Sequence, residues 1–271
     1  MSDGGMGLHC HGIDCCWECH HGRPSHPVDA DDGGCVQRGC YRVSIVVPWR
    51  PDGCHRDAAW SYLRRLWEQR YTGWQILEGR PPDGGWCKAA AVAAAVERAA
   101  GEVLVVADAD VWCEGVQAAV DAVTAGAPWA VPHWHVHRLT ETATAAVLAG
   151  GRLDGELGGS RWRRLERQPY PGFAGGGLVV LPRVLYREVP LDPRFVGWGQ
   201  EDECWALALT TIAGVPWRGE APLWHLWHPP QPRTSSRWGS PASQALCRRY
   251  QAARTPAAMR RLLGEMPGYG A

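Results

Sequence analysis

The chain has 271 residues, of which 45% are apolar, and its 28 basic and 28 acidic side chains give a formal net charge of zero. These values argue against global disorder, collagen and coiled coils, and the neutral charge gives no general reason to expect nucleic acid as a partner. No run approaches the ~20 apolar residues that span a bilayer, so we expect no membrane insertion. The N-terminus shows no signal-peptide pattern, and 11 cysteines without one indicate a reducing, cytoplasmic setting.

Residues 1–41 differ in composition from the rest of the chain. They are rich in glycine and histidine, show no regular apolar period and carry six of the 11 cysteines. Two short-spaced cysteine pairs separated by 15 residues fit tetrahedral zinc, which predicts a structural Zn²⁺ in a separate N-terminal segment. A leader with free thiols is the alternative. The candidate zinc ligands are Cys16, Cys19, Cys35 and Cys40, with Cys10, His11, Cys15, His20 and His21 as substitutes.

From residue 42 onward, apolar strands alternate with helical segments. β-Branched runs bounded by turn residues predict buried strands, and apolar residues three or four apart predict amphipathic helices. Short connections between them indicate an α/β fold with a mostly parallel central sheet and flanking helices. The predicted elements are, in chain order, strand 41–49, helix 56–71, strand 74–79, helix 86–100, strand 101–110, helix 115–125 and strand 128–133.

The alternation breaks after residue 150. A Gly- and Arg-rich stretch at 150–172 predicts a loop or a lid. We expect the α/β domain to occupy residues 42–228 and a helical tail to occupy residues 229–271. The remaining predicted elements are strand 175–183, helix 201–213, strand 215–227 and tail helices near 242–252 and 256–264.

Two acids, Asp108 and Asp110, directly follow the apolar run VLVVA. In open α/β sheets, ligands bind at the carboxyl edge of the strands, where these acids would lie. Two carboxylates one residue apart can share a divalent cation, and Mg²⁺ and Mn²⁺ favour such carboxylate and phosphate sites. The motif predicts a metal site, with a solvated acidic turn as the alternative.

A second motif, GWGQEDE, opens the predicted helix at 201–213. Glycines on either side of Trp198 allow a ligand to approach the backbone closely. Three acids follow, of which Glu201 and Asp202 come first. Acids at a helix N-terminus also complement the helix dipole, by about 0.3–1 kcal/mol each. That alternative explains the acids but not the Gly-Trp-Gly before them.

Together, the two motifs give the chain a resemblance to glycosyltransferases of the GT-A fold. Residues 43–110, with VSIVVPW and VLVVADAD, resemble the nucleotide-sugar half of family-2-type inverting enzymes. Residues 172–205, with GFAGGGLVVLPR and GWGQEDE, resemble the C-terminal part of β-1,4-galactosyltransferases and polypeptide GalNAc-transferases. This resemblance implies a metal-dependent, inverting hexosyltransferase that uses a nucleotide-diphosphate sugar, with UDP as the expected nucleotide.

The resemblance implies a Mn²⁺ or Mg²⁺ site at the sheet edge. Asp110 would ligate the ion, and Asp108 would reach the ribose of the sugar nucleotide and the ion with its waters. The family also supplies a metal-ligating histidine further along the chain, where WHLWHPP offers His225 and His228. His225 is preferred because it ends an apolar stretch; a histidine satisfied in the core or on the surface is the alternative.

The same resemblance assigns the residues around the transferred sugar. Asp202 falls where inverting galactosyltransferases have their catalytic base. Glu201 would hold donor or acceptor hydroxyls, and Trp198 would line the sugar and acceptor site. The glycines that would pass under the sugar are Gly175, Gly176 and Gly177.

The chain departs from the family pattern after the first strand. Family-2 enzymes usually have an Asn- or Asp-bearing turn there, whereas this chain has PWRPDG. Its first three residues would have to meet the nucleoside or the diphosphate, and the acid that often contacts uracil is either Asp83 or Glu78. The donor-site candidates are Pro48, Trp49, Arg50, Asp83 and the only lysine, Lys88.

Three histidines, His133, His135 and His137, alternate in the stretch VPHWHVHRL. On a strand they would share one face, which is geometrically suitable for a metal. Because no acid or cysteine is near in sequence, we favour packing and hydrogen bonding over ligation.

Several functions remain open at this point. The acceptor hydroxyl could belong to a glycan, a protein or a small molecule. Arginines and aromatics interleave in SRWRRLERQPY, which leaves DNA as a minority partner and a DNA-base glycosyltransferase acting on hydroxylated pyrimidines as an alternative. A nucleotidyltransferase would share the metal acids without needing GWGQED. A catalytically inactive carbohydrate- or nucleic-acid-binding protein is the alternative from another class.

Overall fold

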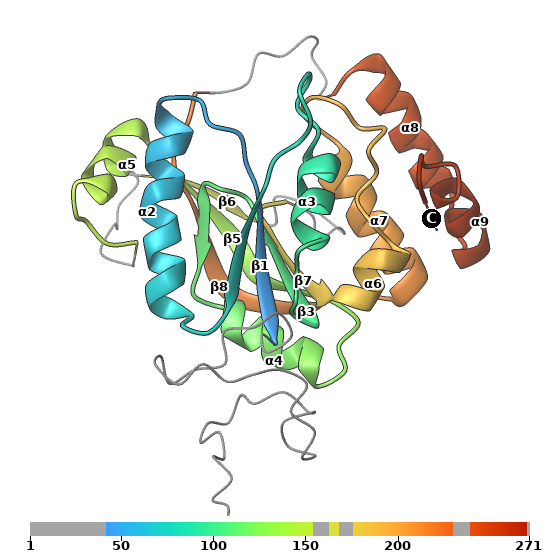
Figure 1. Ribbon diagram of the computed structural model, residues 1–271, viewed down its shortest axis with the longest axis horizontal. Helices are drawn as coiled ribbons and strands as arrows, with labels where there is room; N and C mark the ends of the chain where they lie inside the picture. The colour runs from blue at the N-terminus through green and yellow to red at the C-terminus, as the bar shows by residue number, and fades with distance from the viewer. Residues whose placement is uncertain (1–41, 154–162, 168–175, 230–238, 270–271) are drawn as a thin grey trace, which may run out of the picture.

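The computed structural model describes residues 42–153, 163–167, 176–229 and 239–269. Within them, eight strands form one sheet in the order β2-β1-β3-β7-β5-β8-β4, with β6 paired to β5. Helices flank this sheet, as Figure 1 shows, so the predicted α/β class is confirmed. Four candidate zinc ligands and one candidate sugar-site glycine lie outside the described residues, namely Cys16, Cys19, Cys35, Cys40 and Gly175.

The sheet is mixed, with a majority direction. Strands β1, β2, β3, β5 and β8 run one way, and β4, β6 and β7 run the other way. The parallel pairs are β1 with β2, β1 with β3 and β5 with β8. The strand bounds are β1 Val43–Pro48, β2 Gln75–Gly79, β3 Val103–Ala107, β4 Val111–Cys113, β5 Ala130–Leu139, β6 Arg163–Arg167, β7 Leu178–Pro182 and β8 Trp217–His225.

Two helical layers cover the two faces of the sheet (Figure 1). Helices α2, α4 and α5 contribute to one buried cluster, and α3, α6, α7, α8 and α9 contribute to the other. The helix bounds are α2 His55–Arg70, α3 Lys88–Val96, α4 Val116–Thr124, α5 Glu141–Leu148, α6 Arg183–Glu188, α7 Glu201–Ala213, α8 Pro241–Ala252 and α9 Pro256–Leu263. No helix among the described residues is long and apolar enough to cross a membrane.

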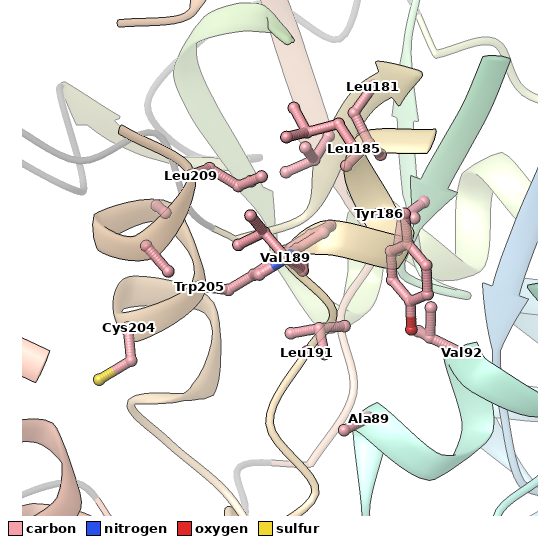
Figure 2. Packing of buried hydrophobic residues seen from close by; sticks show 14 of the residues in the cluster. Ala89, Val92, Leu181, Leu185, Tyr186, Val189, Leu191, Cys204, Trp205 and Leu209 are labelled. Carbon is pink, nitrogen blue, oxygen red and sulfur yellow. Dashed lines mark hydrogen bonds between the residues drawn. The ribbon is translucent and has the colours of Figure 1, made fainter. Parts of the chain in front are cut away.

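Helix α7, which carries the GWGQEDE acids, is held by an extensive apolar contact. Figure 2 shows Trp205 and Leu209 of α7 beside Val189 and Leu185. The indole N–H of Trp205 also donates a hydrogen bond to the carbonyl of Val189 at 2.8 Å. Helices α8 and α9 pack into the same core through fully buried residues such as Met259, so the predicted tail belongs to the same body. This packing anchors α7, and with it the backbone position of its N-terminal acids.

Four elements, β4, β6, α5 and α6, were not predicted, and one predicted strand is longer than expected. That strand, β5, continues past the predicted end to Leu139, with two register irregularities against β8 between Val131 and His135. Helix α5 follows it, capped by the Thr140 side chain, which accepts from the Ala143 N–H. β4 and β6 are only three and five residues long, and α6 has six residues, so none offers a full period in sequence.

The topology brings two chain segments to the same sheet edge. β3 and β8 run in the same direction, so the acids after β3 and the histidines at the end of β8 lie at one edge. The short strand β4 closes the gap, because Val111 pairs with His225 and the Leu226 N–H donates to the Asp110 carbonyl at 2.9 Å. The candidate site is therefore built on hydrogen-bonded strand ends.

Candidate active site

Asp110, His225 and His228 form a cluster with the composition of a metal site. One ligand atom from each lies within 4.8 Å of the other two. Nε2 of His225 is 3.9 Å from Asp110 Oδ1, and Nε2 of His228 is 3.4 Å from Asp110 Oδ2. The sequence offered the two histidines as alternatives, whereas the structure brings both to the acid. Among the described residues, this is the only such group.

Backbone carbonyls orient both imidazoles. Nδ1 of His225 lies 2.8 Å from the Leu226 carbonyl, and Nδ1 of His228 lies 2.9 Å from the Pro229 carbonyl. A carbonyl oxygen only accepts, so Nδ1 must carry the proton in each ring. In the neutral rings the lone pair is then on Nε2, which faces Asp110. Such outer hydrogen bonds fix the tautomer and direction of metal-ligating histidines.

The charge state of the cluster also suits a cation. Burial alone would raise the pKa of Asp110, but the charges of His225, His228 and Arg56 lower the pKa below its ordinary value. Burial lowers the pKa of His225 in spite of the nearby Asp110 charge. The cluster thus favours an ionised carboxylate together with a neutral His225 imidazole, the forms in which these groups ligate metals.

Lys88 occupies the space between Asp108 and Asp202. Its Nζ is 2.6 Å from Asp108 Oδ1 and 2.8 Å from Asp202 Oδ1, and its side chain is 9% exposed. Burial would lower the pKa of Lys88, but Asp108, Asp202 and Glu201 raise the pKa well above its usual value. Burial raises the pKa of Asp108 to about 6 although Lys88 opposes the shift. Asp108 therefore binds Lys88 and is not part of the Asp110 cluster.

The N-terminus of α7 presents its acids to this site from the other side. Gln200, the residue before the helix, has a φ of 75°, a left-handed conformation that is costly for a residue with a Cβ. Burial, followed by the charge of Asp202, raises the pKa of Glu201 to about 7. Strain and perturbed acids are typical of functional sites, and the sequence had placed both predicted catalytic acids here.

A cavity of about 240 Å³ adjoins the cluster. The exposed Trp198 connects the two, because its ring lies 5.8 Å from the Arg56 guanidinium and 6.2 Å from the His228 ring. Nη2 of Arg56 is buried and has no hydrogen-bond partner among the described residues. A guanidinium with one unpaired nitrogen beside the Trp198 ring suits a phosphate-bearing aromatic ligand. The cavity is lined by Arg50, Pro51, Asp52, Arg56, Trp86, Gly197 and Trp198.

The donor-site residues predicted around the first strand fall into different surroundings. Pro48 and Trp49 are buried, and the Trp49 indole N–H donates to Glu78 at 3.2 Å. Arg50 lines the cavity but donates to the carbonyls of Pro82 and Gly84, so it also holds the loop before α3.

The two acids considered for uracil differ in their availability. Asp83 is exposed on the loop that Arg50 holds. Glu78 also accepts from the Trp60 indole and from Arg64, which leaves it tied into the protein. Contact of these residues with a nucleotide stays a prediction.

Gly177 is required by the fold itself. Its φ is 74°, and a Cβ at this position would come within 2.6 Å of a Leu223 methyl group on β8. Its carbonyl accepts from the Asp108 N–H at 2.8 Å, so it also supports the acidic turn. Gly176 beside it is buried with a φ of 86°. Their place under a sugar stays a prediction, and Gly177 borders the acids.

Sequence reasoning missed Arg56 and Trp86. Arg56 lies in the first turn of α2, where an arginine looks like an ordinary surface residue. Trp86 precedes α3 and carries no periodic signal of its own. Only the tertiary fold brings them to the cavity, with the Arg50 guanidinium 6.0 Å from the Trp86 ring.

The alternating histidines of β5 do not form a metal cluster among the described residues. His133 is buried, and His137 instead packs edge-on against Trp224 at 4.7 Å. The Nδ1 atoms of His133 and His135 are buried without a hydrogen-bond partner in the described part of the chain. The favoured prediction of packing is therefore confirmed for His133 and His137, whereas hydrogen bonding of these Nδ1 atoms is not observed.

Replacement of His133 by leucine should flatten the acid dependence of stability. Burial, then the Arg218 charge, lowers the pKa of His133 to about 3, while in the unfolded chain it titrates near 6.5. Between these values the unfolded state binds more protons, so the free energy of unfolding falls as the pH falls, by up to about 1.4 kcal/mol per pH unit. Urea unfolding of both proteins from pH 7 to 4 measures the difference; parallel profiles would contradict it.

A larger hollow of about 440 Å³ lies at the opposite end of β8. It contains neither the clustered acids nor the site histidines. The residues that line and adjoin the smaller cavity therefore make it the candidate active site. The hollow is lined by Gly115, Ala118, Pro132, Trp217, Arg218, Gly219, Glu220 and Ala221.

The chain has distant structural likenesses among known proteins. No protein-family model matches the sequence, and no curated protein matches it. Among solved structures, the chain is similar to the catalytic domain of Drosophila β1,4-galactosyltransferase 7, with 14% identity and a TM-score of 0.39 over 73% of this chain and 70% of that one. It is also similar to GalNAc-T7 solved with UDP, GalNAc and Mn²⁺, with 10% identity and a TM-score of 0.45 over 82% and 54% of the chains.

A third similar structure is glucosyl-3-phosphoglycerate synthase from Mycobacterium tuberculosis, solved with Mn²⁺ and UDP-glucose. The identity is 15% and the TM-score 0.39, over 85% of this chain and 82% of that one. At such values the likeness decides nothing about activity. We therefore infer the function from the residues of the site.

Proposed function

We propose that the chain is a metal-dependent glycosyltransferase of the GT-A type, which moves a sugar from a nucleotide-diphosphate donor to an acceptor hydroxyl with inversion. The observation that carries the proposal is the Asp110, His225 and His228 cluster, joined through Trp198 to a cavity where Nη2 of Arg56 has no hydrogen-bond partner among the described residues. The predicted base, Asp202, lies at the same site.

The ligand set favours Mn²⁺ over Mg²⁺. Two imidazoles and one carboxylate fit a borderline ion better than the hard Mg²⁺, which prefers oxygen ligands and retained waters. A divalent ion bound there supplies charge stabilisation for a departing diphosphate. Arg56 would add hydrogen bonds to phosphate oxygens, and Trp86 and Trp198 would offer faces for stacking.

Asp202 is suited to act as the general base. It pairs with Lys88 through Oδ1, so its second oxygen, Oδ2, remains for the proton of an acceptor hydroxyl. The helix behind it fixes the direction of the carboxylate. A base on one side of the sugar and the diphosphate site on the other produce a single displacement with inversion.

Turnover of a nucleotide sugar tests the proposal without knowledge of the acceptor. The full chain is incubated with UDP-glucose, UDP-galactose, UDP-GlcNAc and UDP-GalNAc, and UDP release to water is followed. We expect release from at least one donor with Mn²⁺, less with Mg²⁺ and none with EDTA. Titration of UDP with and without Mn²⁺ measures whether nucleotide binding also depends on the metal.

Pyrophosphate release from nucleoside triphosphates, with no UDP release, would instead indicate a nucleotidyltransferase. UDP binding that is independent of any metal would contradict the role of the cluster.

A further inference from the structure

Lys88 links two acids that belong to different parts of the site. Asp108 follows β3 and is two residues from the metal-ligand candidate Asp110, whereas Asp202 lies in the first turn of α7. The Lys88 ammonium, at the start of α3, contacts one oxygen of each, at 2.6 and 2.8 Å. Three elements distant in sequence thus meet at a single buried cation.

We propose that Lys88 is a positioning residue for the base: its ammonium holds the Asp202 carboxylate at a fixed distance from the Asp108 side of the site, and it does not bind donor phosphate. The inference rests on the proposed function. It assigns Lys88 an effect on the chemical step, which separates it from residues that act on donor affinity.

Burial and charge support this role. A lone ammonium with a side chain only 9% exposed would be costly, and the two carboxylates offset that cost. Its raised pKa keeps Lys88 charged throughout the range in which an enzyme would work. Of its three N–H donors, two point to carboxylates, so the cluster carries no excess positive charge for a phosphate.

Arg56 provides the contrast. Its Nη2 is buried without a partner among the described residues, and the guanidinium borders the cavity. An anionic donor would therefore gain more from Arg56 than from Lys88, whose ammonium is already neutralised. Removal of Arg56 should weaken donor binding, and removal of Lys88 should slow turnover.

A double-mutant cycle with Asp202 tests the inference. Lys88→Met, Asp202→Asn and the double variant are compared with the wild type, using the UDP-sugar that the wild type hydrolyses fastest. We expect Lys88→Met to lower kcat by roughly 100-fold, because a misplaced group costs about that much, while Kd for UDP with Mn²⁺ changes less than ~3-fold. The double variant should be no more than ~3-fold slower than Asp202→Asn, since both changes remove the same function.

A merely structural or phosphate-binding lysine would behave differently. If the two losses in kcat multiply, or if Lys88→Met weakens UDP binding by more than ~10-fold, the positioning role is overturned. Lys88→Arg keeps the charge and should recover part of the lost kcat; if Lys88→Met does not fold, the cycle is run with Lys88→Arg. Arg65→Met, an exposed charge change on α2, is the matched control.

Measurements on the wild type distinguish a failure of the proposed function from a failure of the Lys88 role alone. A wild type that neither binds UDP with Mn²⁺ nor releases UDP from any donor overturns the proposed function and the Lys88 role with it. An active wild type whose losses in kcat multiply overturns only the role of Lys88.

Discussion

Replacement of Asp110 by alanine is expected to remove Mn²⁺-dependent function, with binding of UDP in the presence of Mn²⁺ weakened at least ~100-fold. Two imidazoles without the carboxylate hold a divalent ion poorly, and Asp110 is the acid that both Nε2 atoms face. Calorimetric titration of UDP with Mn²⁺ measures the loss, and UDP release measures its effect on turnover. The melting temperature without metal should stay near that of the wild type.

Asp121→Ala is the matched control for that change. Asp121 is an exposed acid on α4, hydrogen-bonded to Gln117, and its removal should leave Mn²⁺-dependent binding unchanged. Full activity of the wild type in EDTA would show that the cluster is not a metal site.

Asp202→Asn should lower turnover by about 10²–10⁴-fold, which is the usual contribution of a general base. The variant keeps the size and shape of the side chain and removes its basicity. As a charge at a helix N-terminus alone, Asp202 would affect only stability, by about 0.3–1 kcal/mol. Rates of UDP release, melting temperature and UDP affinity together separate the two roles. The sugar product should also have the anomeric configuration opposite to that of the donor.

Glu203→Gln provides a control within the same helical turn. Glu203 contacts Gln251 of α8 at 3.5 Å. Its replacement should lower stability by a similar amount, because it also removes a charge from the helix N-terminus, and should leave the turnover rate near normal. If Asp202→Asn turns over normally and Glu201→Gln does not, the base is Glu201, whose pKa of about 7 suits proton transfer at neutral pH.

The sequence predicted those parts of the site that depend on one segment at a time. The run VLVVA placed Asp108 and Asp110 after a buried strand, and GWGQEDE placed Asp202 at the start of a helix, because both signals are local. The same holds for the regular strands and helices, whose apolar periods are long.

The rest of the site depends on contacts between distant segments. The ion pair of Lys88 with Asp202 joins residues 114 positions apart, and no periodicity reports the distance between α3 and α7. Likewise, the second histidine joined the cluster because the chain after β8 turns back towards Asp110. Trp49 is buried among apolar residues from several elements, which its place in the sequence did not show; its contact with a nucleotide stays a prediction.

The burial of Lys88 has a consequence for chemical labelling of the protein. Lys88 is the only lysine among the 271 residues, so no other side chain offers an amine to acylating or reductively methylating reagents. An ammonium that is enclosed by two carboxylates reacts only when the surrounding elements open. The rate at which Lys88 becomes labelled therefore reports how often α3 and α7 separate, and a ligand that bridges them would slow it, with no probe introduced into the chain.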